Sequence, residues 1–138
     1  MATSVLVVDD EPADREFLRL WLEQWGYGVT LAGSAAEALE AMLIEPASII
    51  LCDIRMPGYD GLWLVERVRA KWPHTAIVMT TAVNDLQTVM KAKRAGVVDY
   101  ITKPLNWELL RQALGRARVG NNCADNPSYL KKEVMPRR

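Results

Sequence analysis

The sequence has few cysteines and no apolar stretch long enough to cross a membrane. Cys52 and Cys123 are its two cysteines, and they do not form a CxxC pair. This count argues against a disulfide framework or a zinc site and favours a reducing compartment, so we expect a cytoplasmic location. A membrane helix needs about 18 consecutive apolar residues, and the N-terminus lacks the basic and apolar segments of a signal peptide. We therefore expect no membrane association.

The chain also lacks an excess of charge of either sign. Its 17 Lys and Arg residues equal its 17 Asp and Glu residues, so the composition gives no indication of nucleic-acid binding, and we expect none. Hydrophobic residues make up 50% of the 138 residues and charged residues 25%, which is typical of a globular protein. A chain of this length is expected to form one domain with a sizeable core.

Short apolar runs alternate along the chain with segments of helical periodicity. Five runs predict strands, at residues 5–8, 27–32, 49–52, 76–79 and 100–102. Residues that commonly start helices precede the helical segments, namely Pro12, Ser34, Asn84 or Asp85, and Asn106. Five strand–helix units predict an α/β fold with a doubly wound, five-stranded parallel sheet. Residues 119–138 lack apolar periodicity, so we expect one domain at 1–118 and a linker or disordered tail at 119–138.

Polar side chains stand at the ends of four predicted strands. Asp9 and Asp10 follow the first strand, Asp53 follows the third, Thr81 the fourth and Lys103 the fifth. The carboxyl ends of parallel strands share one edge of the sheet, so these side chains should converge. Three carboxylates within about 5 Å repel one another by roughly 3 kcal/mol per pair at an effective dielectric of about 20. Mg²⁺ would relieve that repulsion, and a cation, an ammonium and a hydroxyl around one carboxylate suit phosphoryl transfer onto it.

Each of these residues has an ordinary structural interpretation when it is taken singly. The acidic pair could be a solvated loop or a helix cap, Asp53 a turn residue, Thr81 a cap and Lys103 a surface lysine. Four such coincidences at successive strand ends favour the functional interpretation. His74 is expected to be a solvated loop residue, and Cys52 is expected to point into packing.

Residues 4–118 resemble the receiver domain of two-component response regulators. The motifs VLVVDDEP, LCDIRMPGYDG, VMTTA and DYITKPL stand in the order and at the spacing of that family. The resemblance implies a flavodoxin-like (βα)5 fold with strand order 2-1-3-4-5. Leu105 and Val97 replace the family's usual Phe and Ala, which affects packing near the fifth strand.

The resemblance also implies a phosphoacceptor and a metal site. Asp53 would receive a phosphoryl group from a sensor histidine kinase, a phosphotransfer protein or a small phosphodonor. Asp9, Asp10, Asp53 and the backbone carbonyl of Arg55 would bind Mg²⁺, with Asp10 rather than Asp9 expected to contact the ion directly. The protein would then catalyse only its own phosphorylation and dephosphorylation and would not be an enzyme in the usual sense.

Further implied roles concern the response to phosphorylation. Thr81 would hydrogen-bond the phosphoryl group and Lys103 would pair with it, while Thr81 and Tyr100 would form the switch. The Lys103–Pro104 peptide bond would be cis. The switch would alter the surface of the fourth helix, fifth strand and fifth helix, which would control an output and could mediate homodimerisation. Arg55 and Val83 fall where the family lines the approach of the hydrolytic water, so slow loss of phosphate is expected.

Two other classes share features with this pattern. A phosphatase that forms an aspartyl-phosphate would need its nucleophile after the first strand and a second Asp two residues later, whereas Asp9 and Asp10 are adjacent. A nucleotide- or flavin-binding module would need a glycine-rich phosphate loop, and neither a P-loop nor a complete GxGxxG follows a predicted strand. Turnover of a phosphate ester and binding of nucleotide or flavin would distinguish these classes.

Overall fold

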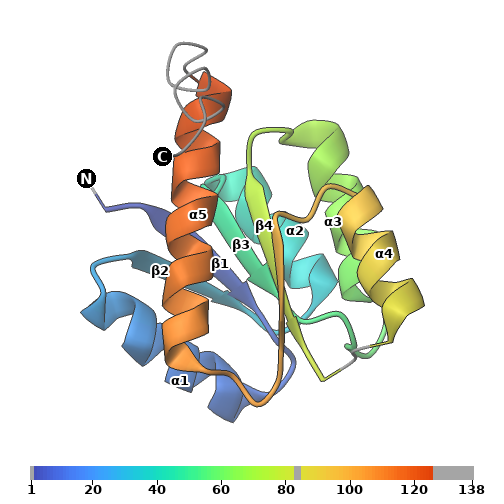
Figure 1. The fold of residues 1–138 in the computed structure, drawn as a ribbon, viewed down its shortest axis with the longest axis horizontal. Helices are drawn as coiled ribbons and strands as arrows, with labels where there is room; N and C mark the ends of the chain where they lie inside the picture. The colour runs from blue at the N-terminus through green and yellow to red at the C-terminus, as the bar shows by residue number, and fades with distance from the viewer. Residues whose placement is uncertain (1, 83–84, 126–138) are drawn as a thin grey trace, which may run out of the picture.

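A computed structural model describes residues 2–82 and 85–125 of the chain. Ten elements alternate between strand and helix along it (Figure 1). They are β1 (Ser4–Val8), α1 (Pro12–Gln24), β2 (Gly28–Ala32), α2 (Ala35–Ile44), β3 (Ile49–Cys52), α3 (Gly61–Lys71), β4 (Ala76–Thr81), α4 (Leu86–Arg94), β5 (Asp99–Thr102) and α5 (Trp107–Asp125). All five predicted strands and all five predicted helices are therefore confirmed.

The strands form one parallel sheet in the order β2-β1-β3-β4-β5, which confirms the predicted topology. The register brings the strand ends level with one another. Val8 pairs with both Ala32 and Cys52, and Thr81 pairs with Thr102. Residues that directly follow these positions therefore meet at one edge of the sheet.

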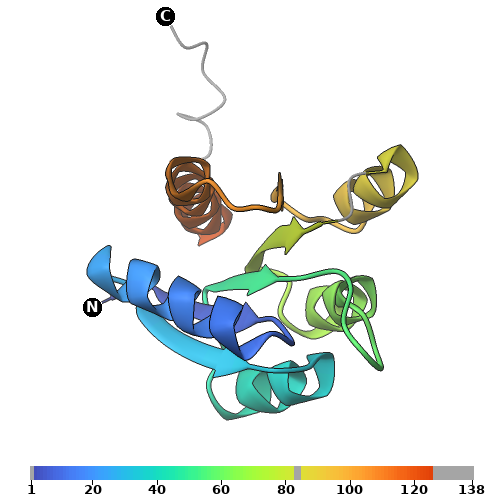
Figure 2. The same cartoon turned by 90° about the horizontal axis from the view of Figure 1, so that it is seen from below.

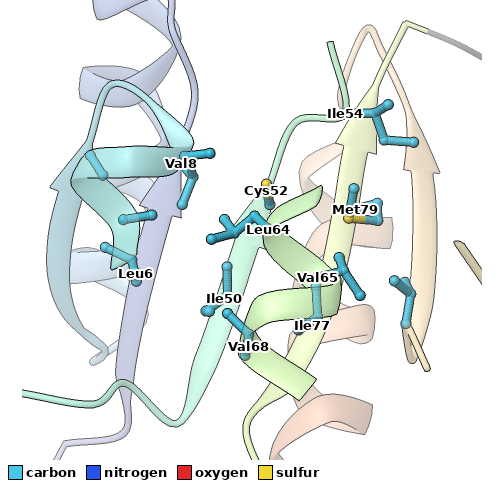
Figure 3. Packing of buried hydrophobic residues seen from close by; sticks show 14 of the residues in the cluster. Leu6, Val8, Ile50, Cys52, Ile54, Leu64, Val65, Val68, Ile77 and Met79 are labelled. Atoms are coloured by element: carbon cyan, nitrogen blue, oxygen red, sulfur yellow. The ribbon is translucent and has the colours of Figure 1, made fainter. Parts of the chain in front are cut away.

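Strand side chains alternate between two cores, one on each face of the sheet. Leu6, Ile50 and Ile77 contribute to the core under α2, α3 and α4, part of which is drawn in Figure 3. Val7 and Leu51, one position further along their strands, contribute to the core under α1 and α5. Figure 2 shows α1 and α5 on one side of the sheet and the other three helices on the opposite side. This alternation explains the continuous apolar runs, because both faces of each central strand are covered.

Local signals in the sequence set the helix boundaries. The Ser34 hydroxyl accepts a hydrogen bond from the Glu37 backbone N–H, as expected for an N-cap. Asp85, one of the two alternatives, caps α4 by accepting from the Thr88 N–H. Gly26 ends the turn after α1 with φ at 95°, a conformation that residues with a Cβ rarely adopt.

Helix α5 continues through Asp125, past the domain boundary expected at residue 118. Extending an existing helix avoids the cost of nucleation, so polar residues without apolar periodicity can continue it. The rest of the expected tail, residues 126–138, lies outside the described residues. Among the helices that the structure describes, none is long and apolar enough to span a membrane.

Candidate functional site

The backbone hydrogen bonds of the sheet continue into the residues beyond the strands. The Asp9 N–H donates to the Ala32 carbonyl at 3.1 Å, and the Asp53 N–H donates to the Val8 carbonyl at 3.0 Å. At the end of the β4–β5 pair, the Lys103 N–H donates to the Thr81 carbonyl at 2.8 Å. These bonds fix the backbone of the site residues as rigidly as the sheet itself.

Lys103 lies at the centre of the site. Its Nζ donates to Asp9 Oδ2 and Asp53 Oδ2, both at 3.0 Å, and to Asp14 Oδ2 at 3.3 Å. The Asp9 side chain is fully buried and the Asp53 side chain is 10% exposed. The structure thus brings together residues from the ends of β1, β3 and β5, as the strand-end pattern predicts.

The second oxygen of each buried carboxylate accepts a backbone hydrogen bond. Asp9 Oδ1 accepts from the Glu11 N–H at 3.0 Å, and Asp53 Oδ1 accepts from the Arg55 N–H at 3.2 Å. Buried charges require such partners, because an unpaired carboxylate inside a protein is strongly destabilising. Both side chains are consequently held in one orientation.

Asp9, Asp10 and Asp53 form an acidic cluster whose oxygen ligand atoms lie within 4.8 Å of one another. Oxygen donors of this kind suit a hard divalent cation, and Mg²⁺ commonly uses one or two carboxylates and completes its shell with water. The cluster carries three negative charges against the single ammonium of Lys103. The donor set therefore fits the predicted Mg²⁺ in both chemistry and spacing.

The charge distribution also affects Lys103 itself. Burial alone would lower its pKa, but hydrogen bonds to Asp53 and Asp9, together with their charges, raise the pKa above its ordinary value. Lys103 is therefore a cation at neutral pH and can act as a positive charge within the site.

The two predicted switch residues lie on adjacent strands beside the cluster. Thr81 is the last residue of β4 and is fully buried. Tyr100 lies on β5 and packs, partly buried, against the core under α3 and α4. Burial, followed by the charges of Asp85 and Asp53, raises the Tyr100 pKa. Its hydroxyl is therefore neutral at physiological pH, and the residue packs against the core that α4 helps to cover.

The remaining sequence predictions can be located as well. The Lys103–Pro104 bond is cis, as the resemblance implies. Cys52 is buried in the core, and burial raises the pKa of its thiol above the ordinary range. His74 is exposed in a loop, as expected. Arg55 lies directly after the cluster, with its side chain exposed, whereas Val83 lies outside the described residues.

Two further residues of α1, which no motif in the sequence singles out, contact the site. Asp14 reaches Lys103, and Arg15 Nη1 donates to the Asp9 backbone carbonyl at 2.6 Å. Both lie in the first turns of α1, directly after the acidic pair. Their position in the sequence indicates proximity to the site, because the first side chains of a helix lie near the end of the strand that precedes it.

A glycine supports the loop that follows Asp53. A Cβ at Gly61 would lie 2.4 Å from the Asp53 carbonyl oxygen and 2.9 Å from Ile54 Cα. The Gly61 N–H also donates to the Ile54 carbonyl at 2.8 Å. The start of α3 thus packs directly against the backbone of the site, and this close approach requires glycine.

Comparison with known proteins agrees with this geometry. The family model of the response regulator receiver domain matches residues 5–115. The chain belongs to this family. It is therefore a receiver domain of the kind found in two-component signal transduction.

The receiver domain is similar to regions of longer curated regulators. It is 40% identical over 124 residues to the transcriptional regulatory protein AruR of Pseudomonas aeruginosa, covering 86% of this chain and 49% of AruR. It is 33% identical over 121 residues to the transcriptional regulatory protein ZraR of Escherichia coli, covering 88% of this chain and 27% of ZraR. The chain thus spans from about a quarter to a half of the length of these relatives.

Solved structures show the same fold. A CheY-like receiver domain protein from Methanospirillum hungatei has a TM-score of 0.82 at 28% identity, with 88% of this chain and 98% of that chain covered. NtrX from Brucella abortus, crystallised with ADP, has a TM-score of 0.86 at 29% identity, with 93% of this chain but only 30% of NtrX covered. These similarities confirm the predicted fold class.

Proposed function

We propose that this receiver domain accepts a phosphoryl group on Asp53 and changes its α4-β5-α5 surface in response. The observation that carries this proposal is the direct contact of Lys103 Nζ with Asp53 within the three-carboxylate cluster. A carboxylate held next to a permanent cation, 10% exposed and facing an acidic cation site, combines a nucleophile with the charges that transfer requires.

The transfer itself is a nucleophilic displacement at phosphorus. An oxygen of Asp53 forms the new P–O bond while the bond to the donor breaks, either P–N in a phosphohistidine or P–O in a small acyl phosphate. The leaving group takes the bonding electron pair, and no oxidation occurs. The donor is a sensor histidine kinase, a phosphotransfer protein or a small phosphodonor, and the chain promotes only its own phosphorylation and dephosphorylation.

Asp9, Asp10, Asp53 and the Arg55 backbone carbonyl would hold Mg²⁺. The ion supplies charge neutralisation for the phosphoryl oxygens when it is bound. Asp9 is fully buried and its backbone is held by Ala32, so it contributes a fixed charge. Asp10 is less buried than Asp9 and Asp53, so it is better placed to contact a hydrated ion directly.

Lys103 and Thr81 would stabilise the phosphorylated form. The Lys103 ammonium already contacts Asp53 and can pair with the new phosphoryl charge of about −1.5 to −2. The Thr81 hydroxyl would move toward that group and open space for Tyr100. This is a shift between two packings of the same residues, biased by local contacts.

The surface that would respond already has the character of an interaction surface. Leu86 and Met90 of α4 are 72% and 46% exposed, and Leu109 of α5 is 52% exposed. Homodimerisation through this surface remains a prediction. Because AruR and ZraR are named transcriptional regulatory proteins, we infer an output in transcription, mediated by another domain or partner and not by direct nucleic-acid binding of this domain.

Mass spectrometry of the intact protein after incubation with acetyl phosphate tests the proposal. With Mg²⁺ the wild type should gain one phosphoryl group, and Asp53→Asn should gain none. A gain by the wild type in the absence of divalent metal would contradict the proposed site. Steady turnover of a phosphate ester would instead favour the phosphatase class, and binding of nucleotide or flavin would favour the nucleotide-binding class.

A further inference from the structure

Asp14 contacts Lys103, but it is neither a predicted metal ligand nor the predicted phosphoacceptor. Its Oδ2 lies 3.3 Å from Lys103 Nζ. Its side chain is 48% exposed, compared with 0% for Asp9 and 10% for Asp53. Of these three carboxylates, Asp14 is therefore the one most accessible to water and the most easily separated from the ammonium.

Helix α1 holds Asp14 in this position. Pro12 begins the helix and Asp14 lies in its first turn, where the helix dipole favours an acid. Arg15, the next residue, ties the helix to the Asp9 backbone carbonyl. The dipole accounts for an acidic residue in this turn, but it does not require that residue to reach across to the loop after β5. The contact with Lys103 is a separate feature of this chain.

Lys103 has a limited number of hydrogen-bond donors, so its contact with Asp14 affects what else it can bind. An ammonium group has three N–H donors, and Asp9, Asp14 and Asp53 each accept one. A phosphoryl group on Asp53 needs at least one of these donors. Asp14 makes the longest of the three contacts, so its bond to Lys103 is the one that the incoming group can replace with the least disruption.

We propose that Asp14 is a positioning residue that restrains phosphorylation by holding Lys103 in its unphosphorylated arrangement. The inference rests on the proposed function of Asp53. An incoming phosphoryl group competes with Asp14 for the donors of Lys103, and it also meets the negative charge that Asp14 adds to the site. Removing this carboxylate frees one donor of Lys103 and lowers the repulsion of an anionic donor.

Phosphorylation rates with acetyl phosphate at saturating Mg²⁺ test the role of Asp14. Asp14→Asn should be phosphorylated about two- to fivefold faster than the wild type, the range expected for a half-exposed ion pair. Asp14→Glu keeps the charge and should remain close to the wild-type rate. Glu16→Gln is the matched control, because Glu16 lies on the same helix but pairs with Arg19 at the surface; its rate should not change.

Beryllofluoride, a tetrahedral mimic of the phosphoryl group, provides a readout without bond breaking. Its Kd should fall in Asp14→Asn by a similar factor, whereas a loss of structure would raise it. An Asp14→Asn variant that is no faster than the wild type would overturn the role of Asp14, as would an equal gain in Glu16→Gln. Failure of the wild type to gain any phosphoryl group would instead overturn the proposed function of Asp53.

Discussion

At the scale of single residues, acidic side chains outnumber the cations of the site. Lys103 contacts Asp9, Asp14 and Asp53, and Asp10 completes the acidic cluster. A charge excess of this kind destabilises the folded chain unless a metal ion offsets it. The arrangement therefore favours ligand binding over the stability of the free protein.

The first prediction concerns thermal stability and Mg²⁺. Adding Mg²⁺ should raise the melting temperature of the wild type, by an amount equivalent to about 2.7 kcal/mol at a hundredfold excess over Kd. Without metal, Asp10→Asn should be more stable than the wild type by about 1–3 kcal/mol, because its repulsion of the two neighbouring carboxylates is removed. Thermal melts across a Mg²⁺ titration measure both effects. An unresponsive wild type, or a destabilised Asp10→Asn, would argue against the cluster.

The second prediction concerns the lifetime of the phosphorylated form. Arg55 offers only hydrogen-bond donors and Val83 has no polar side-chain atom, so neither can orient a water by accepting its proton. Phosphate loss should therefore be slower in the wild type than in the double variant Arg55→Asn with Val83→Glu. Decay of the phosphorylated protein at fixed Mg²⁺ measures this. Equal lifetimes, or a shorter one for the wild type, would mean that Lys103, the metal and backbone access set the rate.

At the scale of the elements, strand ends and helix starts build the site together. Sequence alone predicted the strand ends, because continuous apolar runs stop abruptly at Asp9 and Asp53 and sheet parallelism follows from the alternating pattern. It did not predict the contact of Asp14 with Lys103. The position of Asp14 in the first turn of α1 indicates that it lies near the site, but its contact with Lys103 also depends on the path of a loop far along the chain, which has no local signature.

The aromatic residues of α1 illustrate the same limit. Helical spacing predicts one apolar stripe on α1, formed by Phe17, Leu18, Trp21, Leu22 and Trp25. Leu18 and Leu22 are buried in the core and Trp21 and Trp25 pack against it partly buried. Phe17, in contrast, is 60% exposed, and its ring contacts Trp21. Periodicity defines a stripe of apolar residues, but a stripe broader than the contact with the sheet leaves part of itself exposed.

The third prediction concerns the close packing of α3 against the site. Gly61→Ala should destabilise the protein by about 1–3 kcal/mol, because the new methyl group would overlap the backbone that follows Asp53. Gly115→Ala is the matched control, since a Cβ in that part of α5 meets nothing within 4 Å. It should stabilise the helix by about 0.5–1 kcal/mol. Urea unfolding of both variants measures the difference, and a Gly61→Ala variant as stable as the wild type would contradict the packing.

At the scale of the whole molecule, the sheet joins the proposed phosphorylation site to the α4-β5-α5 surface. Thr81 and Tyr100 lie on neighbouring strands, and Tyr100 faces the core beneath α4. A small movement of Thr81 can thus be transmitted to α4 without unfolding any element, because packed side chains adopt discrete alternatives.

The fourth prediction follows from this connection. Phosphorylation should change amide hydrogen exchange in α4, β5 and the start of α5, and the change should be lost in Thr81→Ala. Helix α2, which packs against β1, β2 and α3, should show little difference and serves as an internal reference. Exchange in α4 and β5 that is identical in the free and phosphorylated forms would reject the switch.

The most direct test of the central claim is to locate the phosphoryl group. After phosphorylation with acetyl phosphate and Mg²⁺, borohydride reduces an aspartyl phosphate to homoserine, and peptide mass spectrometry then identifies the altered residue. The structure predicts homoserine at position 53 and unchanged aspartates at positions 9, 10, 14 and 60. Conversion at any of those other positions, with Asp53 unchanged, would contradict the account.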